Sequence, residues 1–95
     1  MIVKFHPDAE TELLEARSWY QARSPLSALG FAHEVARAVE LIGQSPSRYP
    51  QIGAGTRRFL LRRFPFGVVY RQVAEEIEIV AVAHLKRRPQ YWSPR

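Results

Sequence analysis

The side chains best suited to chemistry in this sequence are cationic and aromatic, and they gather in its second half. An arginine donates paired hydrogen bonds to a phosphate and stays charged, while tyrosine and tryptophan rings offer faces on which bases stack. This basic-aromatic set predicts an anionic partner: nucleic acid, the ribosome or an acidic protein segment. Its members are Arg57, Arg58, Arg62, Arg63, Arg71, His84, Lys86, Arg87, Arg88, Tyr91 and Trp92.

The charge is divided unevenly between the two halves of the 95-residue chain. Residues 1–50 hold five Lys/Arg and six Asp/Glu, a net charge of −1, whereas residues 51–95 hold nine Lys/Arg and three Asp/Glu, a net charge of +6. A basic half of this kind favours binding to a polyanion. The spacing agrees equally well with arginines that only keep the strands soluble or dock an acidic partner.

One reaction open to this set is metal-free RNA cleavage, in which the 2′-hydroxyl attacks the phosphate. The reaction needs a base, an acid and cations beside the developing charge, and the histidine, tyrosine, lysine and arginine side chains of this set can supply these roles. The chain has three histidines and no cysteine. Because no histidine has a further His, Cys or Asp at the spacing of a metal site, we predict no metal site, and we predict no cofactor.

The carboxylates are less informative than the cations. Eight of the nine lie on the predicted helices or in the turn at residues 75–76, where a solvated surface explains them. We expect the ninth, Glu78, to pair with a strand arginine. We expect Trp92 to be a core residue in preference to a ligand-binding residue.

Length and composition predict one domain, residues 1–95, with a single modest core, because 46% of the residues are hydrophobic. The lack of cysteine excludes a disulfide scaffold and suits a reducing compartment. The N-terminus has no long apolar stretch, and the longest purely aliphatic run is Ile79–Ala83. We therefore expect neither a signal peptide nor a membrane span, and a cytoplasmic location.

Apolar periodicity predicts two helices after an opening strand at Ile2–Phe5. The first helix runs from Pro7 to Arg23, and the second begins after Ser24, its expected N-cap, and stops at Gly43. Their tight connection predicts an antiparallel helical hairpin. Small residues on the second helix would allow the two helices to approach each other closely. The expected buried stripes are Ala9, Leu13, Ala16 and Tyr20, then Ala28, Ala32, Val35, Val39 and Ile42, and the small residues are Ala28, Ala32 and Ala36.

Three further strands are predicted at Arg57–Arg63, Phe66–Val73 and Ile77–His84. They follow a loop at Ser45–Thr56, in which residues 53–55 form a plain turn. The short connections require antiparallel neighbours. The expected fold is therefore α+β in the order β-α-α-β-β-β, with the helical hairpin packed on one face of a mainly antiparallel sheet.

Four phrases of the sequence resemble the RelE/ParE superfamily of small bacterial toxins, and most of all its ParE branch. They are the opening V-K-F-H-P-x-A, the end of the second helix with Pro46 and Pro50, the strand FPFGVVYR and the tail IEIVAVAHLKRRPQYW. Each phrase is weak alone, but together, in this order, they cover essentially the whole chain.

The resemblance implies the toxin of a type II toxin–antitoxin module, bound in a hetero-oligomer by a cognate antitoxin, often one with a ribbon-helix-helix DNA-binding part. ParE-like members inhibit DNA gyrase and trap its cleaved DNA, whereas RelE-like members cut mRNA in the ribosome with strand cations and a C-terminal Tyr or His.

Gly67 stands where many of the nucleases have an arginine, which favours gyrase over mRNA as the target. A third alternative is a basic nucleic-acid or protein-binding module without toxicity. In the nuclease alternative the catalytic groups are His84, Arg87 and Tyr91. The residues expected to contact the target or nucleic acid are Arg58, Arg62, Arg71, Lys86, Arg87, Arg88 and Trp92.

Overall fold

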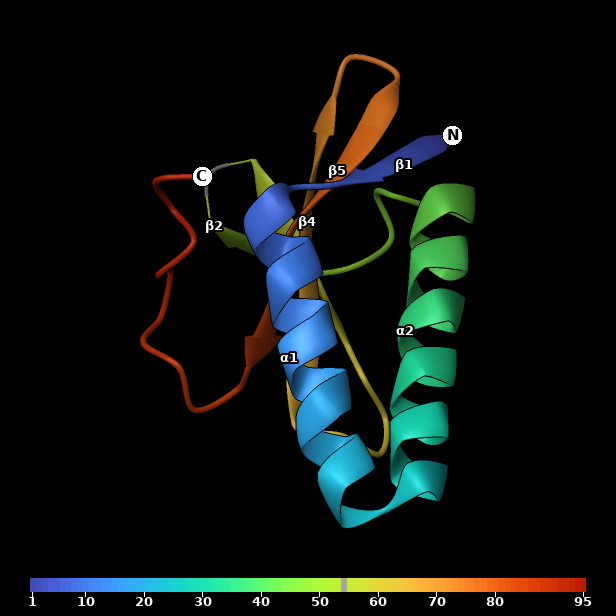
Figure 1. The fold of residues 1–95 in the computed structure, drawn as a ribbon. Coiled ribbons are helices and arrows are strands. Elements are labelled where there is room, and N and C mark those ends of the chain that lie inside the picture. The colour runs from blue at the N-terminus through green and yellow to red at the C-terminus, as the bar shows by residue number, and fades with distance from the viewer. Residues whose placement is uncertain (54) are drawn as a thin grey trace.

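The computed structural model describes residues 1–53 and 55–95, and in them two helices pack on a five-stranded sheet (Figure 1). The predicted α+β class is confirmed, with one strand more than expected. The elements are β1 (Ile2–Phe5), α1 (Pro7–Arg23), α2 (Pro25–Gln44), β2 (Gln51–Gly53), β3 (Thr56–Leu60), β4 (Phe66–Val73) and β5 (Glu76–His84).

The strands lie side by side in the order β1-β5-β4-β3-β2. β5 lies between β1 and β4, parallel to β1 and antiparallel to β4. The helical hairpin and strands β2, β3 and β4 lie between β1 and β5 in the sequence and provide the long connection that parallel strands need. The other pairs, β4 with β3 and β3 with β2, are antiparallel, so the prediction of a mainly antiparallel sheet is confirmed.

The additional strand, β2, lies inside the segment that was expected to be a loop. It pairs antiparallel with β3, and Gln51 lies opposite Arg57. Three residues are too few to show an alternating pattern, so the sequence carries no signal for this strand. The turn expected at residues 53–55 includes Ala54, which lies outside the described residues.

β3 ends at Leu60 and not at Arg63 as predicted, because a carboxylate of α2 takes the amides of Arg62 and Arg63. Glu34 accepts hydrogen bonds from the amides of Arg62 (2.8 Å) and Arg63 (3.3 Å) and pairs with the Arg63 guanidinium at 2.8 Å. Burial alone would raise the pKa of Glu34, but these bonds outweigh burial and hold the pKa below its usual value. The expectation that Glu34 lies on a solvated surface is therefore wrong.

Both helices form where the sequence predicts them. The amide of Asp8 donates to Nδ1 of His6 at the start of α1 (3.0 Å), and the amide of Ser27 donates to Oγ of Ser24 at the start of α2 (3.3 Å). The predicted N-cap at Ser24 is confirmed. Within the described residues, neither helix has the length and apolar character needed to cross a bilayer.

The main core fills the space between the helical hairpin and one face of the sheet. The predicted stripe of α1 lies against this core, with Ala9 buried and the other three residues partly buried. The predicted stripe of α2 is confirmed at Ala28, Val35 and Ile42, but the helix is rotated towards Phe31 and Ala38, and Ala36 is exposed. Two stripes of equal period run along α2, and the one carrying Phe31 faces the sheet because this ring packs among Tyr20, Phe64 and Phe66. Buried in α2 are Ala28, Phe31, Val35, Ala38 and Ile42, whereas Ala32 and Val39 are only partly buried.

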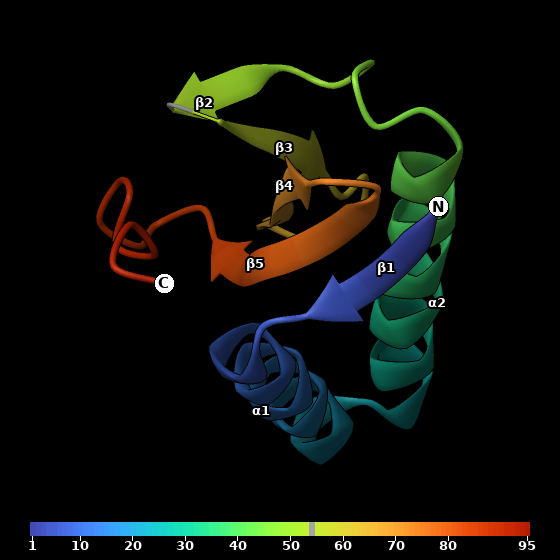
Figure 2. The same ribbon diagram turned by 90° about the horizontal axis from the view of Figure 1, so that it is seen from above.

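The other face of the sheet carries a smaller apolar cluster, which residues 85–95, the C-terminal tail, cover in part. In Figure 2 the sheet lies between α2 and this tail. Trp92 closes the cluster with only 8% of its surface exposed, packing with Val69, Val80, Ala81 and Ala83. The expectation that Trp92 is a core residue is therefore confirmed.

Candidate functional site

The C-terminal tail contains neither helix nor strand and folds as a series of turns. The amide of Arg87 donates to the carbonyl of His84 (3.0 Å), and the amide of Ser93 donates to the carbonyl of Gln90 (3.0 Å). Consecutive turns send neighbouring side chains in different directions. The basic residues of the tail therefore do not share one surface merely because they are adjacent in the sequence.

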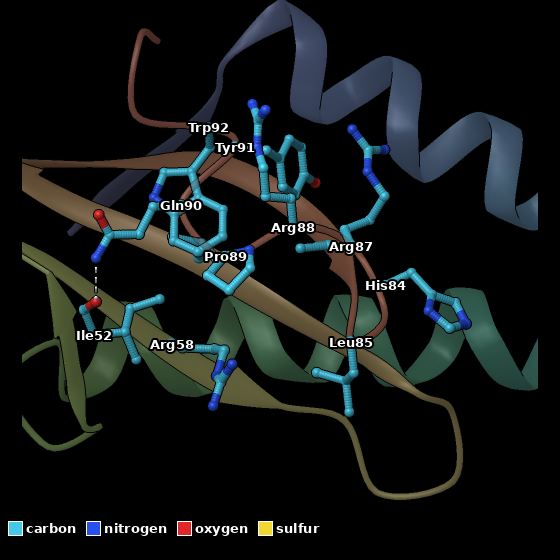
Figure 3. A pocket seen from close by; sticks show the side chains of 12 residues that line it. Ile52, Arg58, His84, Leu85, Arg87, Arg88, Pro89, Gln90, Tyr91 and Trp92 are labelled. Carbon is cyan, nitrogen blue, oxygen red and sulfur yellow. Dashed lines mark hydrogen bonds between the residues drawn. The ribbon is translucent and has the colours of Figure 1, made fainter.

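A hollow of about 210 Å³, the tail hollow, lies between the tail and the sheet. Arg58 lines it from β3, and Pro89 and Trp92 line it from the tail (Figure 3). The side-chain amide of Gln90 donates to the carbonyl of Ile52 (3.3 Å) and joins the tail to β2. The hollow thus combines one strand cation with an aromatic and apolar wall.

Arg58 occupies the space that a side chain at Gly67 would need. A Cβ atom built on Gly67 would lie 2.7 Å from Cδ and 2.9 Å from Cγ of Arg58. These atoms are in the middle of the arginine side chain, so relief requires the whole side chain to move. The lack of a side chain at Gly67 therefore lets Arg58 lie across the sheet.

Replacing Gly67 by alanine is expected to displace Arg58 and to lower the free energy of unfolding by about 1 kcal/mol through crowding. Gly30→Ala is the matched control, because the atoms nearest its new Cβ would be those of Arg63 at 3.5 Å and Phe64 at 3.6 Å, which are ordinary contact distances. That change should stabilise α2 by about 0.5–1 kcal/mol. Urea unfolding of both variants measures the difference, and equal stabilisation by both would contradict the position given to Arg58.

Arg87 and Arg88 leave the tail on the side opposite to Arg58. Figure 3 shows both side chains pointing away from Arg58. The guanidinium carbon of Arg87 lies 3.9 Å from the centre of the Tyr91 ring, a cation–π contact that fixes its direction. The structure therefore separates these cations by direction: all three line the tail hollow, but the side chains of Arg87 and Arg88 point away from that of Arg58.

His84, at the end of β5, has one ring nitrogen engaged by the backbone. Its Nδ1 accepts a hydrogen bond from the amide of Lys86 (3.0 Å), and its ring lies edge-on to Phe66. In the neutral ring the proton is therefore on Nε2, which can donate to an anion. His84 and Arg87 line the tail hollow and also a groove of about 470 Å³ between α1 and the ends of β4 and β5.

The hydroxyl of Tyr91 is occupied within the protein. It donates to Glu12 of α1 at 2.7 Å. Burial and the bond to this carboxylate raise the pKa of Tyr91 above its ordinary value, so the phenol is a weaker acid than an exposed tyrosine. This environment suits a structural hydroxyl better than an acid or base that must exchange protons.

Glu12 and Arg95 belong to the site, although sequence reasoning missed both. Glu12 was expected to be solvated, but its side chain is 12% exposed and pairs with Arg95 at 2.9 Å. The two residues are 83 positions apart, so no local pattern connects them.

Three predicted contact residues lie away from the tail hollow. The guanidinium of Arg71 pairs with Glu78 at 2.6 Å, which confirms the strand pair expected for Glu78 and leaves Arg71 less free to bind a target. Arg62 is exposed in the β3–β4 connection beside Glu34, and Lys86 is exposed at the start of the tail. Of the predicted contact residues, only Arg58, Arg87, Arg88 and Trp92 line the hollow.

The arrangement supports binding of an anion more readily than acid–base chemistry. Arg87 and Arg88 are exposed, and among residues 1–53 and 55–95 no ion pair joins either of them to a carboxylate. The same part of the chain contains no group of three or more His, Cys, Asp or Glu placed to hold a metal ion. The tail therefore offers two arginines that no carboxylate neutralises in the described chain, and one of them, Arg87, stacks on the Tyr91 ring.

Comparison with known proteins gives two matches over most of the chain. A family model described as the ParE toxin of the type II toxin–antitoxin system, parDE, matches residues 3–89. A chain in the solved structure of the chromosomal ParDE TA system from P. aeruginosa has a TM-score of 0.78 at 24% identity, covering 88% of this chain and 95% of that one. The structural match shows the fold alone. A search of curated proteins finds no match.

Proposed function

Because the chain belongs to the ParE toxin family of type II toxin–antitoxin systems, we propose that it arrests growth by acting on DNA gyrase while gyrase holds cleaved DNA. The observation that carries the proposal is the exposed pair Arg87 and Arg88, whose charges are not neutralised by an ion pair in the described chain. Arginine binds phosphate oxygens in pairs and strengthens contact with a DNA-bearing target. The protein would then act in the cytoplasm, where gyrase works.

A cognate antitoxin, which the family implies, is the proposed neutralising partner. We propose a ribbon-helix-helix protein whose acidic amphipathic segment lies in the groove of about 360 Å³ between α1 and α2. Leu14 lines this groove with 54% of its surface exposed, and Arg17 lies beside it. Apolar side chains of the segment would cover Leu14 while its carboxylates meet Arg17.

Ribosome-dependent mRNA cleavage is the second candidate, and the position of His84 favours it. Within the described residues the Nε2–H of this ring makes no hydrogen bond, and His84 and Arg87 line the same groove, so a proton donor and a cation are available on one surface. The engaged hydroxyl of Tyr91 argues against it, because the tyrosine would have to leave Glu12 before it could exchange a proton. Gyrase therefore remains the preferred target.

Tight induction of the gene in a bacterium without the antitoxin separates these functions. Gyrase poisoning predicts growth arrest with induction of the DNA-damage response, and rescue when the antitoxin is supplied. Discrete cuts in translated mRNA without DNA damage would instead support the nuclease. Normal growth would contradict both and favour a non-toxic binding module.

A further inference from the structure

We infer that Glu12 is a positioning residue: it clamps the C-terminal tail to α1 and so fixes the direction of Arg87. The hydrogen bonds of Glu12 with Tyr91 and Arg95 support the clamp itself. Its consequence for toxicity rests on the proposed function, in which the tail cations meet the target.

Glu12 gathers four hydrogen bonds on one carboxylate. Oε1 accepts from the amide of Val82 (3.0 Å) and from Nη1 of Arg95 (2.9 Å), while Oε2 accepts from the hydroxyl of Tyr91 (2.7 Å) and from Nη2 of Arg95 (3.0 Å). The side chains of Glu12 and Arg95 are 12% and 14% exposed. A paired arginine fork in such a shielded place fixes both partners more firmly than a surface ion pair does.

The clamp reaches Arg87 through the Tyr91 ring. Glu12 holds the ring by its hydroxyl, and the guanidinium carbon of Arg87 lies 3.9 Å from the ring centre. The guanidinium carbon of Arg95 lies 5.2 Å from the same centre. If the ring moves, Arg87 therefore loses its cation–π contact with Tyr91.

The tail has a second attachment, to the strands, which does not replace the first. Arg95 donates to the carbonyl of Val80 (3.0 Å), and its main-chain oxygen accepts from Arg71 (2.9 Å). Within the described residues, however, the polar contacts between the tail and α1 go only to Glu12 and to Asp8, which lies 3.6 Å from Arg95. Losing Glu12 would leave the tail near the sheet but free to turn about Trp92.

Limited trypsin digestion of the free protein tests the clamp without the target. In Glu12→Gln, the loss of charge weakens both the arginine fork and the tyrosine bond, and we expect cleavage after Lys86 and Arg87 to become roughly tenfold faster because local opening is easier. Cleavage after Arg17 and Arg37, in the helices, should change little. Glu10→Gln, an exposed neighbour on α1, is the matched control and should digest like the wild type.

A second variant, Arg95→Gln, removes the guanidinium that pairs with Glu12, and Arg95 lies outside the apolar core. In a Trp19→Phe background the fluorescence of Trp92 should shift to the red in both Glu12→Gln and Arg95→Gln. Equal acceleration at the tail and helix sites, or unchanged tail cleavage in both variants, would overturn the clamp. If tail cleavage rises selectively but wild-type protein leaves gyrase unaffected, the clamp stands and the proposed target is wrong.

Discussion

Cells expressing the double variant Arg87→Ala/Arg88→Ala should keep growing, although the variant protein folds normally. Both side chains are exposed and lie outside the two apolar clusters, so their loss removes charge without opening the core. If both guanidinium groups meet phosphates, the slope of log binding constant against log salt concentration should fall by about two, one for each lost contact. Binding to gyrase–DNA complexes across a salt series measures this slope.

The control for this prediction is another exposed arginine, outside the tail. Arg37→Ala, on the exposed side of α2, removes one positive charge from the molecule but none from the tail. All these proteins should unfold within about 0.5 kcal/mol of the wild type, as distant surface changes usually do. Undiminished killing by the double variant would remove the tail from the mechanism.

Ala38→Asp is expected to prevent folding, and the matched change Ala36→Asp is not. Ala38 is 0% exposed in the main core, so an aspartate there would bury a carboxylate without partners and overfill the space. A loss of about 4 kcal/mol removes most of the stability of a small domain. Ala36 lies on the same helix but is exposed, and its replacement costs about 0.7 kcal/mol of helix propensity.

Circular dichroism melts of the two aspartate variants test the orientation of α2. Position 36 belongs to the small residues that were expected at the contact between the helices, whereas position 38 was not in the expected stripe. A folded Ala38→Asp protein together with an unfolded Ala36→Asp protein would show that α2 is rotated differently about its axis.

Local signals in the sequence predicted the helices and the longer strands. Ser24 and Pro25 mark the start of α2, and β4 spans the predicted residues Phe66–Val73. The rotation of α2 was not predictable, because Ala32 and Val39 repeat with the same period as Phe31 and Ala38. Only the shape of the facing sheet chooses between these stripes.

The site was predictable in composition but not in geometry. The charge distribution predicted that Arg58 and the tail arginines contact the target. These arginines border one hollow, Arg58 from β3 and the others from the tail. Whether neighbouring arginines point together depends on the turns of the tail, which no periodic pattern reveals. The bond between Glu12 and Tyr91 joins residues 79 positions apart, so it could be found only in three dimensions.

Incubation of the purified protein with DNA gyrase, plasmid DNA and ATP tests the central claim most directly. Gyrase poisoning predicts that linear, gyrase-cleaved plasmid accumulates or that supercoiling is lost, and that the antitoxin reverses the effect. The double variant Arg87→Ala/Arg88→Ala should show neither change. Unaltered supercoiling without cleaved DNA, at protein concentrations well above those of gyrase, would contradict the claim.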